Sequence, residues 1–201
     1  NLSFTNAAGA QVIVESGTLS FGTGVFTQNS GRLTIASGKT LSIGNALTNN
    51  SGALIEGSGT LNLGGLLLTN NGTIKPGGAS TVGALSVTGG FDGGTGTLEL
   101  DLLNTSSHDQ LLVSGSVSVA SPGIVLSPVA MSGASWALGD TFNVIQRTAS
   151  GGSASGALTA PTGFTASVVG TPAPAPAVAL VATAASPAPA PAPAPTPAPS
   201  P

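Results

Sequence analysis

Three short stretches decide the fold: 17–22 (GTLSFG), 39–44 (KTLSIG) and 59–64 (GTLNLG). In each stretch apolar residues alternate with hydroxyl or amide residues, a period of two that is typical of a β-strand with one buried face. A glycine ends each stretch, which indicates a tight turn. The alternation predicts an inner row of Leu19, Leu41 and Leu61 and an outer row of Thr18, Thr40 and Thr60.

A second phrase recurs between these stretches, at 26–31 (FTQNSG), 47–52 (LTNNSG) and 68–72 (LTNNG). Its threonines, Thr27, Thr48 and Thr69, are 21 residues apart each time (48 − 27 and 69 − 48). Short strands repeated at a constant interval predict a parallel β-helix whose coils stack about 4.8 Å apart. The spacing also predicts a ladder of Asn29, Asn50 and Asn71 at a turn, with amides hydrogen-bonded along the axis.

The pattern changes along the chain and divides it into three parts. Residues 1–118 are predicted to form the parallel coils of an all-β solenoid. Residues 119–182 contain strand-like runs at 123–126, 141–145, 164–169 and 178–181. We expect these runs to form antiparallel hairpins that cap the last coil, because an uncovered coil is an aggregation edge. Residues 183–201 form a Pro-Ala-rich segment, predicted to be a disordered tail or linker that favours polyproline II.

The cap must cover a large apolar area at once, and large side chains are scarce in this sequence. The chain contains a single Trp, Trp136, and no Tyr. A lone Trp is often used where much apolar surface must be buried. We therefore expect Trp136 and Phe142 to lie near the closing hairpins, over the last coil.

Composition excludes several classes of protein. Charged residues make up 5% of the 201 residues, with four Lys and Arg and a net charge of −3, so no cationic surface for nucleic acid is expected. The absence of Cys excludes disulfides and thiolate chemistry, and with one His it disfavours a transition-metal site. No apolar run approaches the roughly 18 residues of a membrane-spanning helix. We expect no cofactor and no metal.

Catalysis is the alternative that must be weighed, because parallel β-helices include enzymes that cleave polysaccharides. Such chemistry needs two or three carboxylates converging on a groove. Glu99 and Asp101 share one face of a strand, with the neighbouring leucines on the other, and a solvated strand face is the favoured interpretation. The pair His108–Asp109 follows two serines, yet adjacent residues in a turn do not form a triad. Asp109 is expected to accept hydrogen bonds from turn amides, and we assign no catalytic, cofactor-binding or metal-binding residue.

A family resemblance emerges from five phrases taken in order. Residues 67–78 (LLTNNGTIKPGG) resemble a phrase of bacterial autotransporter passenger domains. The later phrases resemble the C-terminal end of such passengers: 96–102 (GTLELDL), 109–115 (DQLLVSG), 138–145 (LGDTFNVI) and 163–165 (GFT). The resemblance implies a right-handed β-helix, export across the outer membrane and a cap that promotes folding. It also implies that 109–111 is a structural signature. In that family a separate outer-membrane anchor follows, and the Pro-Ala segment stands where a linker would begin.

These observations favour a non-enzymatic, structural or adhesive β-helix that is secreted or exposed on the bacterial cell surface. Its expected partners are a host or bacterial surface glycan or protein, or a second copy of itself. Two alternatives stay open: a glycan-active enzyme that uses Glu99 or Asp101, and a subunit that stacks end to end into filaments.

Overall fold

The computed structural model describes residues 3–119, 123–149, 153–156, 158–169 and 175–187. The sequence prediction for the Pro-Ala segment therefore lies outside the described residues from position 188 onward. Within the described residues the regular elements are β-strands, numbered β1 to β19. No helix in this part of the chain is long and apolar enough to cross a membrane.

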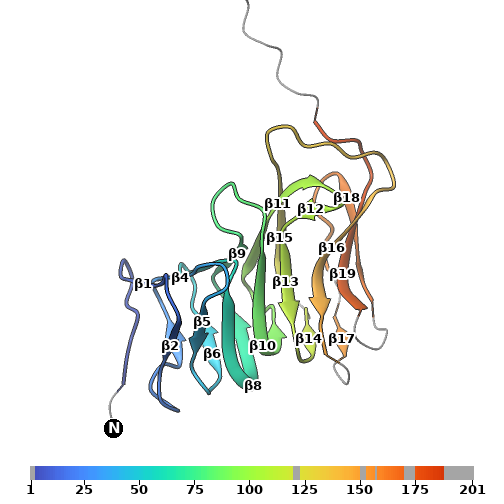
Figure 1. Ribbon diagram of the computed structural model, residues 1–201. Helices are drawn as coiled ribbons and strands as arrows, with labels where there is room; N and C mark the ends of the chain where they lie inside the picture. The colour runs from blue at the N-terminus through green and yellow to red at the C-terminus, as the bar shows by residue number, and fades with distance from the viewer. Residues whose placement is uncertain (1–2, 120–122, 150–152, 157, 170–174, 188–201) are drawn as a thin grey trace, which may run out of the picture.

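The chain winds into a parallel β-solenoid of about five turns, stacked from the N-terminal end to the C-terminal end (Figure 1). Each turn contributes a strand to each of three faces. The first face consists of β1 (Gln11–Val14), β4 (Arg32–Ile35), β7 (Leu54–Gly57), β9 (Thr73–Pro76), β11 (Thr97–Asn104) and β15 (Val125–Ala130). Every neighbouring pair in this series is parallel, as the repeat predicts.

The second and third faces share two long strands that turn a corner. The second face consists of β2 (Thr18–Ser20), β5 (Thr40–Ser42), the first parts of β8 (Thr60–Asn70) and β10 (Ala84–Asp92), β13 (Gln110–Val113) and β16 (Thr141–Arg147). The third face consists of β3 (Gln28–Asn29), β6 (Leu47–Asn49), the second parts of β8 and β10, β14 (Val117–Ser118) and β17 (Ala154–Ser155). Gly64 and Gly65, with φ of +64° and +87°, bend β8 at the corner.

Aliphatic ladders fill the interior between the three faces. On the first face the inward positions are aligned one above another and buried: Val12, Leu33, Ile55, Ile74, Leu98 and Leu126. On the second face Leu41 and Leu61 are fully buried and in register, and Thr40 and Thr60 are partly exposed, as predicted. Leu19 keeps the predicted register with Leu41 but is 37% exposed, because β2 is the end strand of its face. Leu19 therefore continues the predicted inner row in register, but it is not buried there.

The asparagine ladder exists, but the predicted residues are wrong in two of the three coils. Asn29 pairs with Asn49, and Asn49 pairs with Asn70, rather than with Asn50 and Asn71. The spacing between rungs is 20 residues and then 21, so counting a constant interval from Thr27 shifts the second and third rungs by one residue. Because successive strand residues point to opposite faces, this shift exchanges an inward asparagine for an outward one.

Within the C-terminal region, antiparallel pairing covers a smaller part than the sequence predicted. β18 (Phe164–Val168) and β19 (Ala175–Ala182) form an antiparallel pair, and β19 also pairs antiparallel with β16. By contrast β15, β16 and β17 pair in parallel with the coil before them. The prediction of antiparallel hairpins is thus wrong for 123–126, while 164–169 and 178–181 do pair antiparallel. β12 (Ser107–His108) adds a short antiparallel return beside β11.

Candidate functional site

A row of charged side chains runs along the outer surface of the first face, on neighbouring coils. At one end, the Arg32 guanidinium binds the Glu56 carboxylate through Nε at 2.7 Å and also through Nη2. The Thr34 hydroxyl donates to the same oxygen of Glu56 at 3.0 Å. The Glu56 side chain is only 5% exposed, so this carboxylate is covered as well as paired.

In the next coil, Lys75 stands between two acids of β11. Its ammonium binds the Glu99 carboxylate and lies 4.0 Å from Oδ1 of Asp101. Burial lowers the pKa of Lys75, but the hydrogen bond to Glu99 and the negative charge of Asp101 outweigh it, so the net pKa is raised. Lys75 therefore remains charged and offsets part of the negative charge of the two acids.

The prediction that Glu99 and Asp101 form a solvated strand face is wrong for Asp101. The Asp101 residue is 2% exposed, and its Oδ2 has no hydrogen-bond partner among the described residues. Glu99 keeps partial access to solvent, with its side chain 34% exposed. The two acids do share the outer face of β11, because Leu98, Leu100 and Leu102 occupy the inner one.

Asp109 has the structural role that the sequence predicted. Its two carboxylate oxygens accept hydrogen bonds from the backbone N–H groups of Gly83 at 2.8 Å and Asp101 at 2.9 Å. It is fully buried, and burial raises its pKa to about 7. The carboxyl ties the loop before β10 to β11, and it is directed to backbone N–H groups rather than to a serine.

His108 points to a different environment from its neighbour Asp109. Its ring stacks edge-on against Phe142 with centroids 5.4 Å apart, and Nε2 lies 3.4 Å from the Asn143 carbonyl oxygen. Burial lowers the pKa of His108, which favours the neutral ring. The His108 and Asp109 side chains therefore have separate hydrogen-bond partners.

The ion pairs of the charged row therefore connect side chains on neighbouring coils. A general acid or base must be able to approach the bond it acts on, and Asp101 and Asp109 are buried while Glu56 and Glu99 are ion-paired. Among the described residues no group of three or more His, Cys, Asp or Glu side chains is arranged to hold a metal ion. A signal in the sequence could have predicted this row: successive charged residues are separated by about the length of one coil. These residues are Arg32, Glu56, Lys75 and Glu99.

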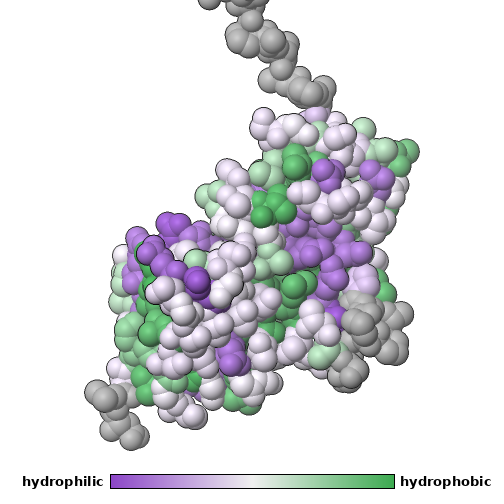
Figure 2. Space-filling view, in the orientation of Figure 1, coloured by the Kyte–Doolittle hydropathy of each residue, from purple (hydrophilic) through white to green (hydrophobic). Residues whose placement is uncertain are grey.

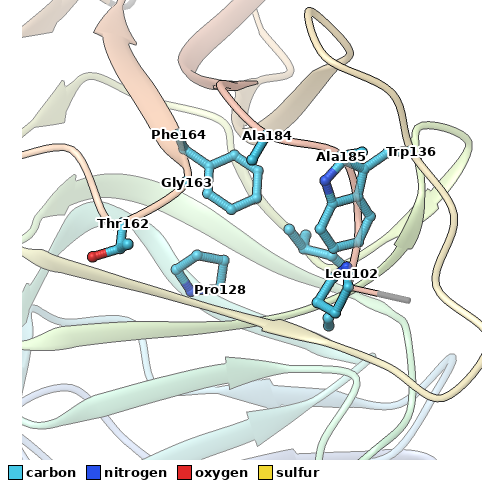
Figure 3. Close-up of a pocket in the computed structure, with 10 residues that line it drawn as sticks. Leu102, Pro128, Trp136, Thr162, Gly163, Phe164, Ala184 and Ala185 are labelled. Atoms are coloured by element: carbon cyan, nitrogen blue, oxygen red, sulfur yellow. The ribbon is translucent and has the colours of Figure 1, made fainter. Parts of the chain in front are cut away.

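A second candidate site is an apolar pocket of about 330 Å³ at the C-terminal end, where β11, β15 and β18 meet the segment after β19. Figure 3 shows its lining side chains gathered around one hollow, among them Leu102, Pro128, Trp136, Thr162 and Phe164. Trp136 and Thr162 supply the only polar side-chain atoms of the lining, and no lining residue is charged. The pocket thus suits an apolar ligand rather than an ionic one.

Three aromatic rings hold the pocket wall in place. Trp136 meets Phe142 edge-on, with ring centroids 5.5 Å apart, and lies 6.1 Å from Phe164. Phe142 is fully buried and also contacts Phe164 at 6.0 Å. The expectation that Trp136 and Phe142 meet beside the closing strands is confirmed, because both rings contact β18. The contributions of Phe164 and Pro128 were not foreseen.

No family model, curated protein or solved structure matches this chain. The geometry defines the class of the molecule: an all-β parallel solenoid with antiparallel strands near its C-terminal end.

Proposed function

We propose that this chain is a non-enzymatic structural or adhesive module, either secreted or exposed on the bacterial cell surface. One observation carries the proposal: the carboxylates of Glu56 and Glu99 on the first face, and of Asp109 beside it, are bound by a cation or by backbone N–H groups. Carboxylates held in this way stabilise the stack of coils and are not free for acid–base chemistry. The extracellular location rests on the resemblance of 67–78 and the later phrases to autotransporter passengers.

The surface chemistry supports adhesion over electrostatic recognition. Figure 2 shows that much of the visible face has near-neutral hydropathy, with distinct hydrophilic and hydrophobic patches, and only 5% of the residues are charged. A rigid stack of strands presents such a surface with little loss of conformational entropy on contact. A surface glycan or protein, from the host or from another bacterium, is the partner that fits this character.

Two assays test the proposal together. Protein-coated beads are washed over cells and over immobilised glycans, and retention under flow is expected to exceed that of beads coated with albumin. The soluble protein is incubated with pectate and alginate, and no new reducing ends or unsaturated products are expected. Cleavage that disappears in Glu99→Gln but persists in Glu15→Gln, an exposed acid outside the charged row, would establish the glycan-active enzyme instead.

The filament alternative has an observation of its own. Ile13 on β1 and Leu19 on β2 are 49% and 37% exposed, and both strands lie at the ends of their sheets. Such edges favour pairing with another chain. Fibres that lengthen with protein concentration, and that are suppressed by Ile13→Lys, would favour this alternative over an adhesive monomer.

A further inference from the structure

The apolar pocket at the C-terminal end is partly built from the start of the Pro-Ala segment. Ala184, Ala185 and Pro187 line it. Between them, Ser186 is held by Trp136 through two hydrogen bonds. The Ser186 backbone N–H donates to the Trp136 carbonyl oxygen at 3.1 Å, and the Trp136 backbone N–H donates to the Ser186 Oγ at 3.3 Å. Residues of the Pro-Ala type therefore already pack against this aromatic wall.

The remaining wall has the chemistry that recognises polyproline II segments. Such segments dock on grooves lined by aromatic rings, where a proline ring lies against a flat apolar face. Trp136, Phe164 and Pro128 provide three such faces around one hollow (Figure 3). A sugar, by contrast, requires several polar side chains, and this pocket offers only those of Trp136 and Thr162.

The chain carries a segment of matching chemistry directly after the pocket. Residues 188–201 are almost entirely alternating Pro and Ala, a composition that favours polyproline II at about 3.1 Å per residue. The segment starts from the pocket wall itself, at Pro187, so entering its own pocket would require an immediate reversal. A Pro-rich polyproline II segment is semi-rigid over several residues and opposes such a reversal, which favours docking on another molecule.

We propose that the pocket binds the Pro-Ala segment, residues 188–201, of a second copy of this chain. Each copy then contributes one pocket and one segment, so the contact is heterologous and links copies in series. This inference concerns assembly and goes beyond the adhesive function, and none of the results below bears on adhesion.

The experiment uses the full chain and a synthetic peptide with the sequence of residues 188–201. Trp136, the only Trp in the protein, reports from the pocket wall. In dilute protein the peptide is expected to shift Trp136 emission saturably. In concentrated protein it is expected to reduce the mass measured by light scattering to that of a monomer. A control peptide with Ser in place of each Pro should do neither.

A pair of surface variants localises the contact. Thr162→Arg places a long cation at the pocket wall and should weaken peptide binding about ten-fold or more. Ser167 is also exposed, but it lies on β18 outside the pocket, so Ser167→Arg should bind within about two-fold of the wild type. Circular dichroism melts check that both variants fold.

Three results would overturn the proposal. The first is a protein that stays monomeric at all concentrations and whose Trp136 emission does not change when the peptide is added. The second is association that persists in excess peptide, which would indicate pairing through the β1 and β2 edges. The third is a change of Trp136 emission on deleting 188–201 that is independent of protein concentration, which would show that the segment docks on its own molecule.

Discussion

At the scale of single residues, side-chain amides connect coil to coil on the third face. Asn6 donates to Asn29 at 2.7 Å, Asn29 to Asn49 at 2.8 Å and Asn49 to Asn70 at 2.8 Å. Each of these amides also donates to a backbone carbonyl of the next coil. Buried amides are tolerated here because the stacking supplies their partners. The close fit extends to Gly72, where an added Cβ would lie 2.8 Å from Asn49 Nδ2.

The first prediction concerns the middle rung of this ladder. Asn49→Ala removes the donor to Asn70 Oδ1 and the acceptor for Asn29 Nδ2 inside the solenoid, which should cost about 2–4 kcal/mol of unfolding free energy. Asn50→Ala, next in sequence but directed outward to Ser30 Oγ, should cost less than about 1 kcal/mol. Urea melts of the two variants decide the matter. A larger loss for Asn50→Ala would restore the ladder predicted from sequence.

Asp109 gives the second prediction, a dependence of stability on pH. Burial raises its pKa to about 7 from an ordinary value of 3.8, so between these pH values the folded protein holds a proton that the unfolded chain releases. This carboxyl therefore stabilises the fold at low pH, and the contribution is lost as pH rises through about 7.

Asp109→Asn removes this titration. The amount by which the wild-type Tm exceeds the variant Tm should therefore be larger at about pH 5 than at about pH 8. Scanning calorimetry across this range measures the difference. His108, whose pKa is lowered by burial, acts in the opposite direction. Because His108 is present in both proteins, its contribution cancels in the difference. A difference that stays constant, or that grows with pH, would contradict the assigned role of Asp109.

The roles of single residues were the hardest feature to predict from the sequence. The alternation in 39–44 and 59–64 correctly predicted Leu41 and Leu61 as inner residues, because a period of two assigns faces within one strand. The alignment of one strand with the next depends on the turn between them, and a turn that is one residue shorter leaves no mark on the hydrophobic pattern. The asparagine ladder was displaced for this reason.

At the scale of elements, the position of a strand in the stack decides how much each rung contributes. Leu41 on β5 lies between coils and is fully buried, whereas Leu19 on β2 is an end rung and 37% exposed. Leu41→Ala should cost about 2–5 kcal/mol and Leu19→Ala about 1 kcal/mol or less. Thr40→Ala, on the outer surface, should stay within about 0.5 kcal/mol. Equal losses for the two leucines in urea melts would mean that β2 is covered.

The direction of strand pairing near the C-terminal end could also not be predicted from the sequence. Pro128 and a change of spacing after 118 suggested hairpins, yet β15 continues the first face in parallel with β11. A proline is tolerated there because β15 lies at the end of its sheet, where one N–H has no strand to bind. The candidate pocket depends on this arrangement, since Pro128 reaches Trp136 and Phe164 only if β15 stacks on β11. The pairing of Trp136 with Phe142 was predictable from the rarity of large side chains, whereas the contributions of Pro128 and Phe164 were not.

At the scale of the whole molecule, contacts run mainly between neighbouring coils. Each coil should therefore make its own contribution to the free energy of unfolding. In such solenoids the free energy approximates a sum of coil terms and nearest-neighbour interfaces. The register allows a clean removal of one coil. Leu33 on β4 occupies the same inner position as Ile55 on β7, so deleting residues 33–54 joins Arg32 to Ile55 with every later side chain still on its proper face.

This deletion should leave a folded protein. Leu19 would stack on Leu61 and Asn29 on Asn70, and the C-terminal strands, which contact only the later coils, would be undisturbed. The urea m-value should fall by about a fifth, one turn in about five, because m scales with the surface exposed on unfolding. Deleting 33–43, about half a coil, is the matched control: it joins Arg32 to Gly44, so residues that lead into the third-face strand β6 fall on the first face, and it should give an unfolded or aggregated chain. If instead both deletions folded with similar m-values, or the full-coil deletion alone failed to fold, stability would not be divisible by coil.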